Sequence, residues 1–370
     1  MSTIVNAFRE ADLKAVINKI KPADDRAVEL ATKRQDALVK PPGSLGKLEE
    51  ASIKLAGITG KVNNEIKKAR IVVMCADNGV CEEGIGSAPI SVTAAQAVNM
   101  NKAITGMSSI AKAFGSEIRV VDVGIATPYE CDDVIKRVVR KGTRNLAKEP
   151  ALTRAEVIKA ISVGLEMAKK AKQEGVDVLG TGEMGIGNTT TSSAILSVLT
   201  GLSVEEVTGR GGGITDSNFL KKKQIIEQAI AMHKPNPDDV LDVMAKVGGL
   251  DIAGMCGVFL GAARERIPVV IDGFISVVSA LCAYRLCPAV RDYLFPSHAS
   301  YEIGYSAAIK ELGLAPYFAL DMRLGEGSGC PLTFAVLHAA CAVMNGMETF
   351  AGAEINDDYL EEIREKDSYT

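Results

Sequence analysis

Five short apolar runs, each ending in glycine or polar residues and followed by a helical pattern, constrain this chain more than any other feature. The predicted strands are Ile71–Ala76, Ile118–Gly124, Val176–Gly180, Pro268–Asp272 and Tyr317–Asp321. Nearly continuous runs of valine and isoleucine separated by helices are typical of parallel strands that are buried on both faces. We therefore predict an α/β fold with a parallel Rossmann-like sheet and helices on both of its faces.

The segments before the first strand and after the last are predicted to be helical. An apolar stripe over 27–31 indicates a helix that Pro41-Pro42-Gly43 stops, and Ser44 is placed to cap the next helix. A last helix is expected through Thr333–Met347, before an acidic tail to which we assign no function.

This pattern also predicts how the chain is divided. Residues 1–69 together with 330–370 are expected to form a small helical domain, and residues 70–329 the α/β domain.

Composition argues against several functions. Across 370 residues, 42 Lys and Arg against 46 Asp and Glu give a formal net charge of −4, which argues against nucleic acid or an anionic membrane as the main partner.

Eight Cys without a C-x-x-C pair and only three His favour a protein without a metal site, and we expect no cofactor. No basic flank precedes an apolar core at the N-terminus, and the longest apolar stretch, Pro268–Tyr284, contains Asp272. A cytoplasmic protein without a membrane span is expected.

The loops that follow the predicted strands are rich in glycine and polar residues. In parallel sheets such loops meet at the carboxyl ends of the strands, where ligands bind. The loop Gly180–Thr189 has the glycines and the following helix start that suit a phosphate. Gly180, Gly182 and Gly185 also satisfy G-x-G-x-x-G, so a nicotinamide-dependent oxidoreductase is an alternative. Against it, Glu183 would repel a pyrophosphate, and the motif follows the third strand instead of the first.

A second glycine loop, Gly209–Gly213, is another candidate anion site. Lys222 follows nine residues later within Lys221–Lys223, and one of these lysines is expected to point back toward the glycines. Lys221 and Lys223 are better explained as a solvated helix face.

Two acidic residues lie at the end of a predicted strand or shortly after one. Glu326 is flanked by glycines, so it has no local packing role, and chemistry is favoured over helix capping. Asp272 fits a ligand contact and a cap equally well. The string Ser297-His298-Ala299-Ser300 lacks the G-x-S-x-G elbow of a nucleophilic serine, so His298 is interpreted as structural.

Taken together, several long motifs resemble one enzyme family, the nicotinate-nucleotide:dimethylbenzimidazole phosphoribosyltransferases. The resemblance runs in order from about Pro22 to Met347. It is carried by the strings beginning Lys40-Pro41-Pro42-Gly43-Ser44, Gly182-Glu183-Met184-Gly185, Asp272-Gly273-Phe274-Ile275 and Met322-Arg323-Leu324-Gly325-Glu326.

The resemblance implies a reaction and a set of residues for it. The family moves the 5-phosphoribosyl group of nicotinate mononucleotide onto a ring nitrogen of the base that becomes the lower ligand of cobamides, the vitamin B12 group. Glu326 is then the catalytic base and Glu183 an auxiliary carboxylate. The remaining substrate-binding positions implied are Gly185, Gly211, Gly212 and Lys222 for the phosphate, Ser300 for the ribose phosphate, and Ser87, Ala88 and Leu324 around the substrates.

The sequence departs from the family at two positions. Family members commonly carry His where Asn78 stands and an aromatic residue near Ala88. A benzimidazole, a purine and a phenolic base therefore all stay open as the acceptor. The family implies a homodimer, or a heterodimer with a paralogue. A non-catalytic paralogue is a third interpretation of the chain, and the retained Glu326 argues against it.

Overall fold

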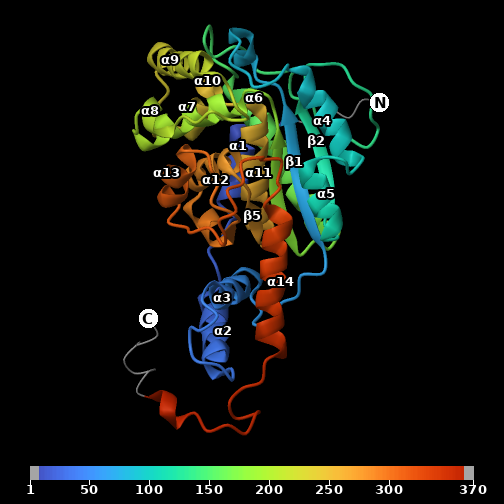
Figure 1. Cartoon of the computed structure of the whole chain (residues 1–370), viewed down its shortest axis with the longest axis vertical. Coiled ribbons are helices and arrows are strands. Elements are labelled where there is room, and N and C mark those ends of the chain that lie inside the picture. The colour runs from blue at the N-terminus through green and yellow to red at the C-terminus, as the bar shows by residue number, and fades with distance from the viewer. Residues whose placement is uncertain (1–7, 362–370) are drawn as a thin grey trace.

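The computed structural model describes residues 8–361, and its centre is one six-stranded, all-parallel sheet (Figure 1). The strands lie in the order β3-β2-β1-β4-β5-β6. This is the order of a doubly wound Rossmann sheet, in which the connections reverse direction between β1 and β4. The predicted fold class is confirmed. The strands are β1 (Ala69–Ala76), β2 (Glu117–Gly124), β3 (Ile135–Lys136), β4 (Val178–Met184), β5 (Val269–Ile271) and β6 (Leu294–Pro296).

Helices cover both faces of this sheet. Successive side chains of a strand point to opposite faces. On β1, Met74 lies close to Gly254 of α11, whereas Ile71 lies close to Gly327 in the loop before α14. The helices are α1 (Glu10–Ile17), α2 (Asp25–Ala37), α3 (Lys47–Thr59), α4 (Ser91–Asn101), α5 (Gly106–Ala113), α6 (Arg154–Gln173), α7 (Asn188–Thr200), α8 (Val204–Val207), α9 (Asp216–His233), α10 (Val240–Val247), α11 (Leu250–Glu265), α12 (Phe274–Leu286), α13 (Gly304–Glu311) and α14 (Cys330–Gly346), with short 3-10 helices η1 (Gly79–Glu83), η2 (Pro288–Tyr293) and η3 (Asp358–Leu360).

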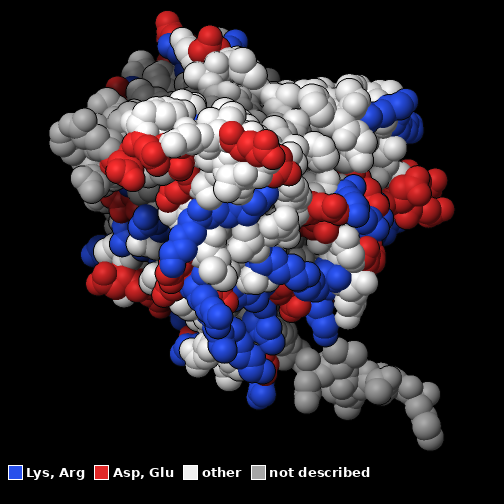
Figure 2. All heavy atoms as spheres, turned by 90° about the horizontal axis from the view of Figure 1, so that it is seen from below, with Lys and Arg blue, Asp and Glu red and all other residues white. Residues whose placement is uncertain are grey.

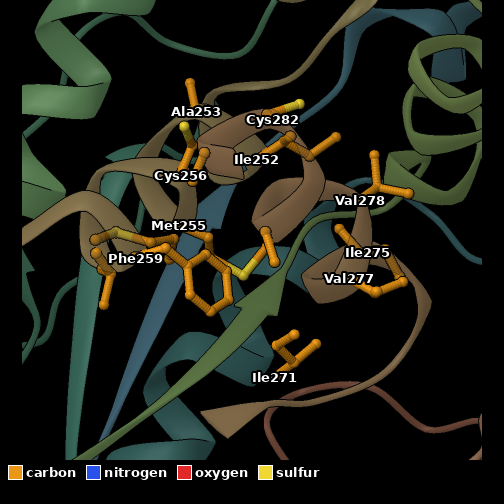
Figure 3. Close-up of a cluster of buried hydrophobic side chains, with 14 of the residues drawn as sticks. Ile252, Ala253, Met255, Cys256, Phe259, Ile271, Ile275, Val277, Val278 and Cys282 are labelled. Atoms are coloured by element: carbon orange, nitrogen blue, oxygen red, sulfur yellow. The ribbon is translucent and has the colours of Figure 1, made fainter. Parts of the chain in front are cut away.

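The core is densest around α11, which is buried along almost its whole length. Figure 3 shows its side chains interleaved with those of α12 and β5, among them Phe259, Val277 and Ile271. On its other side α11 approaches α6 through glycines. A Cβ at Gly164 would lie 2.1 Å from the carbonyl oxygen of Gly254, and one at Gly257 would lie 2.1 Å from that of Ile161. The two helix backbones are therefore in direct contact, which only glycine allows.

The strand predictions were right for the centre of the sheet and wrong at one edge. The strand predicted at Val176–Gly180 begins at Val178 and continues to Met184. The prediction of a strand over Tyr317–Asp321 is wrong. That segment forms a single isolated bridge, Phe318 to His298, and Asp321 has a φ of 52°. The edge strand is β6, a run too short for its apolar pattern to stand out. The two-residue β3 was also missed.

The local helix signals were partly right. The helix predicted through Thr333–Met347 is confirmed as α14, Cys330–Gly346. The cap predicted at Ser44 is wrong. Gly46 caps α3, and the Glu49 carboxylate reaches back to accept from the Leu45 amide at 2.8 Å.

The helices α2 and α3 pack together with α14 below the sheet (Figure 1). They lie near the amino ends of β4 and β5, because residues of α3 and residues just before these strands line one cavity of about 670 Å³. The first helix, α1, packs instead against α6 and α11. The division into residues 1–69 with 330–370 and residues 70–329 stays a prediction, and residues 362–370 of the acidic tail lie outside the described part.

Charge is unevenly spread over the surface. Seen from below, Lys and Arg side chains gather on one part of the face (Figure 2). Within residues 8–361, no helix is both long and apolar enough to cross a bilayer.

The contact between α6 and α11 generates a first prediction. Gly257→Ala should lower the free energy of unfolding by about 1–3 kcal/mol or more, because the added methyl group meets backbone atoms that cannot move aside. Urea unfolding measures this change. The matched control is Gly346→Ala at the end of α14, where nothing lies within 4 Å. The control should be neutral or stabilising by up to about 1 kcal/mol, and equal losses in both variants would contradict the interpretation.

Candidate active site

A pocket opens at the carboxyl ends of the central strands, close to the point where the connections reverse between β1 and β4. The pocket has a volume of about 140 Å³ and adjoins a larger cavity of about 690 Å³, with which it shares Gly211, Gly212, Glu302 and Arg323. Seven of the ten predicted site residues line the smaller pocket: Ser87, Glu183, Gly185, Gly211, Gly212, Ser300 and Leu324.

The glycine loop after β4 is shaped by close approach of other groups. A Cβ at Gly185 would lie 2.3 Å from the carbonyl oxygen of Ala76 at the end of β1. Gly180 and Gly182 lie inside β4 and not in a turn, where they make room for Cys330 of α14 and for the backbone of Glu326. The dinucleotide interpretation of these glycines is therefore not supported, because that fingerprint needs its first glycine in the turn after a strand.

The second glycine loop sits over Lys222. Among the three lysines, Lys222 is the one that points back, as the sequence predicted, and it is 1% exposed. Its Nζ donates to the carbonyl oxygen of Gly209 and to Oγ1 of Thr189, both at 2.9 Å. Burial lowers the pKa of Lys222 to about 8. This ammonium ties the 209–213 loop to the first turn of α7. Lys221 is exposed and Lys223 pairs with Glu205.

Glu326 lies in a tight turn with an unusual backbone. Gly325, Glu326 and Gly327 have φ values of 80°, 63° and 94°, so a non-glycine residue is held in the left-handed region between two glycines. Asp272, at the end of β5, holds this turn in place. Its Oδ2 accepts from the Gly327 amide at 2.9 Å, and its Oδ1 accepts from the Gly329 amide at 2.7 Å. Asp272 therefore acts as the anchor of the turn.

The carboxylate of Glu326 is turned toward α4 and α5. Its Oε2 accepts from the backbone amide of Met107 at 3.4 Å, in the first turn of α5, and its Oε1 accepts from Gln96 at 3.4 Å. Burial raises the pKa of Glu326 above its ordinary value near 4.5, and these donors oppose that effect. Glu326 is thus a buried carboxylate with weak partners, which suits a proton acceptor.

Glu183 lines the pocket beside this turn. Its Oε1 accepts from the backbone amide of Glu326 at 3.3 Å, and its Oε2 accepts from the side-chain amide of Asn188. Burial and the charge of Asp251 raise the pKa of Glu183 to about 8. The two predicted residues are therefore joined through the Glu326 backbone: the Glu183 carboxylate lines the pocket, and the Glu326 carboxylate points toward α4 and α5.

Comparisons with known proteins agree with this geometry. A family model described as Phosphoribosyltransferase matches residues 20–355. Nicotinate-nucleotide–dimethylbenzimidazole phosphoribosyltransferases of Clostridium tetani and Clostridium perfringens are 49% and 51% identical, over 96% of this chain and 98% and 99% of theirs. The crystal structure of CobT from Thermus thermophilus superposes with a TM-score of 0.86 at 37% identity, covering 90% of this chain and 99% of that one.

The chain belongs to the nicotinate-nucleotide–dimethylbenzimidazole phosphoribosyltransferase family.

Three predicted residues do not line the pocket of this phosphoribosyltransferase. Lys222 and the carboxylate of Glu326 lie just behind it, and Ala88 is half-buried outside its lining. Ser87 is exposed and reaches Gly212, while Leu324 is 53% exposed at the rim. The roles of all ten residues stay proposals.

His298 is structural in the described contacts. Its Nδ1 lies 3.0 Å from Oγ of Ser297, which is fully buried and donates to the Asp272 carbonyl oxygen. A serine held in this way is not available as a nucleophile, as the sequence predicted.

Sequence reasoning missed several residues that shape the site. Asn188 bridges Glu183 to Asp251, a fully buried carboxylate at the start of α11, and Glu302 and Arg323 line both cavities. The only signal for Asp251 was an acidic residue two positions after Gly249 in an apolar stretch, and nothing in the sequence linked it to the loop after β4. Within residues 8–361, no group of three His, Cys, Asp or Glu side chains is arranged to hold a metal ion.

The anchoring of the turn can be tested. Asp272→Ala leaves two buried backbone amides without an acceptor, so we expect a loss of about 2 kcal/mol or more in unfolding free energy. Amide hydrogen exchange at Gly327 and Gly329 should accelerate as the turn loosens. Asp238→Ala on the exposed surface is the control and should change neither quantity. Unchanged exchange at Gly327 in Asp272→Ala would show that another contact holds the turn.

Proposed function

We propose that this chain transfers the 5-phosphoribosyl group of nicotinate mononucleotide to dimethylbenzimidazole or a related base, giving nicotinate and an α-riboside phosphate for a cobamide lower ligand. The substrate and acceptor are those in the relatives' names. One observation carries the proposal: the buried carboxylate of Glu326 belongs to a turn with a left-handed backbone, and the Glu326 amide in this turn donates a hydrogen bond to Glu183. Glu183 in turn lines the glycine-rich pocket.

The chemistry needs no activation of the leaving group. In nicotinate mononucleotide the bond from C1′ joins a cationic pyridinium nitrogen, so when this bond breaks its electron pair neutralises the ring. A lone pair on one ring nitrogen of the base forms the new bond to C1′. The other ring nitrogen of the base then loses its proton, and Glu326 accepts it. Charge is balanced, because the positive charge of the pyridinium leaves as that proton.

The glycine loops would hold the phosphate. Gly211 and Gly212 face the pocket with their backbone, and Thr189 in the first turn of α7 lies against Gly211. Backbone amides at a helix start bind phosphate well. Lys222, bonded to Thr189 and to the Gly209 carbonyl oxygen, would supply positive charge from behind this loop. The phosphate would then fix the ribose with C1′ toward Glu183 and the turn.

The acceptor side of the pocket is apolar. Ile186, Phe274, Ile275 and Leu324 contribute to its lining, which suits a flat aromatic base. Dimethylbenzimidazole is the first candidate, with purines and phenols to be compared in competition. We further propose a cytoplasmic homodimer, with a heterodimer of paralogues as its alternative.

The proposed base gives the first functional prediction. With nicotinate mononucleotide and dimethylbenzimidazole, the chain should release nicotinate, and Glu326→Gln should lower kcat by roughly a hundredfold or more. Because the pKa of Glu326 is raised and only the ionised form accepts a proton, wild-type kcat should fall as the pH drops through that pKa. The variant should lack this acidic limb.

Binding provides the check on this prediction. Calorimetry should give similar dissociation constants for nicotinate mononucleotide in both proteins, and the exposed Glu29→Gln should match the wild type in every measurement. If Glu326→Gln turns over at the wild-type rate, Glu326 is not the base. If the wild type binds the nucleotide but releases no nicotinate with any acceptor, the chain is a non-catalytic paralogue.

The proposed phosphate anchor gives a second prediction. Lys222→Met keeps the buried stem but removes the charge, so KM for nicotinate mononucleotide should rise roughly tenfold to a hundredfold, as expected for a charged hydrogen bond. The effect on kcat should be smaller. Lys221→Met is the control, since Lys221 is exposed and bonds the Glu83 carbonyl oxygen. Equal KM values in all three folded proteins would place the anchor elsewhere.

A further inference from the structure

A buried polar bridge lies behind the pocket and connects three elements. Nδ2 of Asn188, the first residue of α7, donates to Oε2 of Glu183 at the end of β4. The same nitrogen donates to Oδ2 of Asp251, in the first turn of α11, at 3.0 Å. Asp251 is fully buried and its other oxygen accepts from the Ile252 amide at 3.0 Å. Two carboxyl groups therefore share one neutral donor.

The strongest influences on this pair do not come from cations. Among residues 8–361, burial, amides, backbone donors and other acids have the largest effects on the pKa values of the two carboxyls. The pKa of Glu183 is raised to about 8 and that of Asp251 to about 6, in both cases mainly by burial. Two neighbouring acids in an apolar site ionise one after the other, because the first charge opposes the second. The second donor to Asp251, the Ile252 amide, lies at 3.0 Å, whereas the second donor to Glu183, the Glu326 amide, lies at 3.3 Å. The negative charge is therefore better supported on Asp251, and the shared proton belongs on Glu183, the member of the pair that faces the pocket.

The charge of Glu183 matters for an anionic ligand. A phosphorylated substrate entering the pocket would meet an ionised Glu183 as a repulsive neighbour, whereas a protonated one would be neutral and could donate a hydrogen bond. Asp251 cannot touch the substrate, because it is fully buried behind Asn188. It can act only on Glu183, by its charge and by the Asn188 donor that the two carboxyls share.

We propose that Asp251 is a positioning residue which, through Asn188, keeps Glu183 protonated so that the pocket admits a phosphorylated substrate. This inference rests on the proposed function and deepens it. It gives the second carboxylate of the site a definite protonation state and assigns a role to a residue far from the reacting atoms.

Other charged groups face the same pocket and have to be separated from this effect. Asp272 at the end of β5 raises the pKa of Glu183, and Asp77 after β1 acts on Asp251. The turn with Glu326 packs against Glu183 from the side of α14. Glu302 and Arg323 line the pocket itself, and Lys222 lies behind its second glycine loop. The pKa of Lys222 also lies at about 8.

Equilibrium binding of nicotinate mononucleotide from pH 6 to 9 tests the proposal without turnover. Wild-type affinity should fall by roughly fivefold to tenfold as Glu183 ionises. In Asp251→Asn the same fall should begin about one pH unit lower, because the neighbouring charge that raises the pKa of Glu183 is gone. In Glu183→Gln the fall caused by deprotonation of Lys222 should remain while the part caused by Glu183 disappears, and Asp251→Asn should add nothing to Glu183→Gln in the double variant.

Infrared difference spectra provide a second readout that needs no ligand. The wild type at pH 7 should show the band of a protonated carboxylic acid that is missing in Glu183→Gln. Even if Asp251→Asn does not fold, this comparison decides whether Glu183 is protonated, which the proposal requires. Asp122→Asn is the matched control, since Asp122 is buried at the end of β2, bonded to the Tyr129 hydroxyl, and should leave the binding profile unchanged.

The outcomes are distinct. Superimposable profiles for wild type and Asp251→Asn, or the absence of a protonated carboxyl assigned to Glu183, would overturn the inference. Failure of the nucleotide to bind at any pH would overturn the proposed function instead, while the infrared comparison would still report on Glu183.

Discussion

The two hydrogen bonds from the amides of Gly327 and Gly329 to Asp272 are the interactions on which the site depends. A left-handed backbone at a residue other than glycine costs about 1–2 kcal/mol, and here it is found at Glu326 within a run of three positive φ angles. Such a conformation persists only where its surroundings fix it. Asp272 fixes it from the end of β5, and Glu183 fixes it from the end of β4 through the Glu326 amide. Two neighbouring strands thus place one carboxylate.

The electrostatics of the pocket follow from the same arrangement. Four carboxyl groups, those of Glu183, Asp251, Asp272 and Glu326, are buried in this region, yet the pocket that Glu183 lines is suited to an anion. Burial raises the pKa of each of them. Backbone amides and one helix start satisfy Asp272 and Glu326, and Asn188 joins the other two. Neutral donors therefore replace the arginines and lysines that usually accompany buried acids, and the positive charge comes from Arg323 in the pocket lining and from Lys222 behind the glycine loop.

Sequence reasoning predicted the fold class and the position of the site because both depend on local patterns. Apolar runs followed by glycine loops indicate parallel strands, and the topology of such sheets brings the loops together. Prediction failed where pairing depends on distant partners. Residues 317–321 have a strand-like pattern but make only one bridge, to His298, whereas the three residues of β6 complete the edge. Asn188 and Asp251 meet only because α7 and α11 begin at the same edge of the sheet, which no local pattern reveals.

The glycines of β4 illustrate why a motif has to be placed in space before it is interpreted. Gly180, Gly182 and Gly185 match a dinucleotide fingerprint in spacing, but each makes room for a different neighbour: the side chain of Cys330, the backbone of Glu326 and the backbone of Ala76. Two of them thus let α14 and the strained turn approach the strand. The same glycine spacing can serve the approach of a ligand or the approach of another part of the protein, since glycine is required wherever backbone meets backbone or ligand. What separates the two is whether the space beside the glycine is filled by the protein itself, and at Gly182 it is filled by the residue proposed to accept the proton.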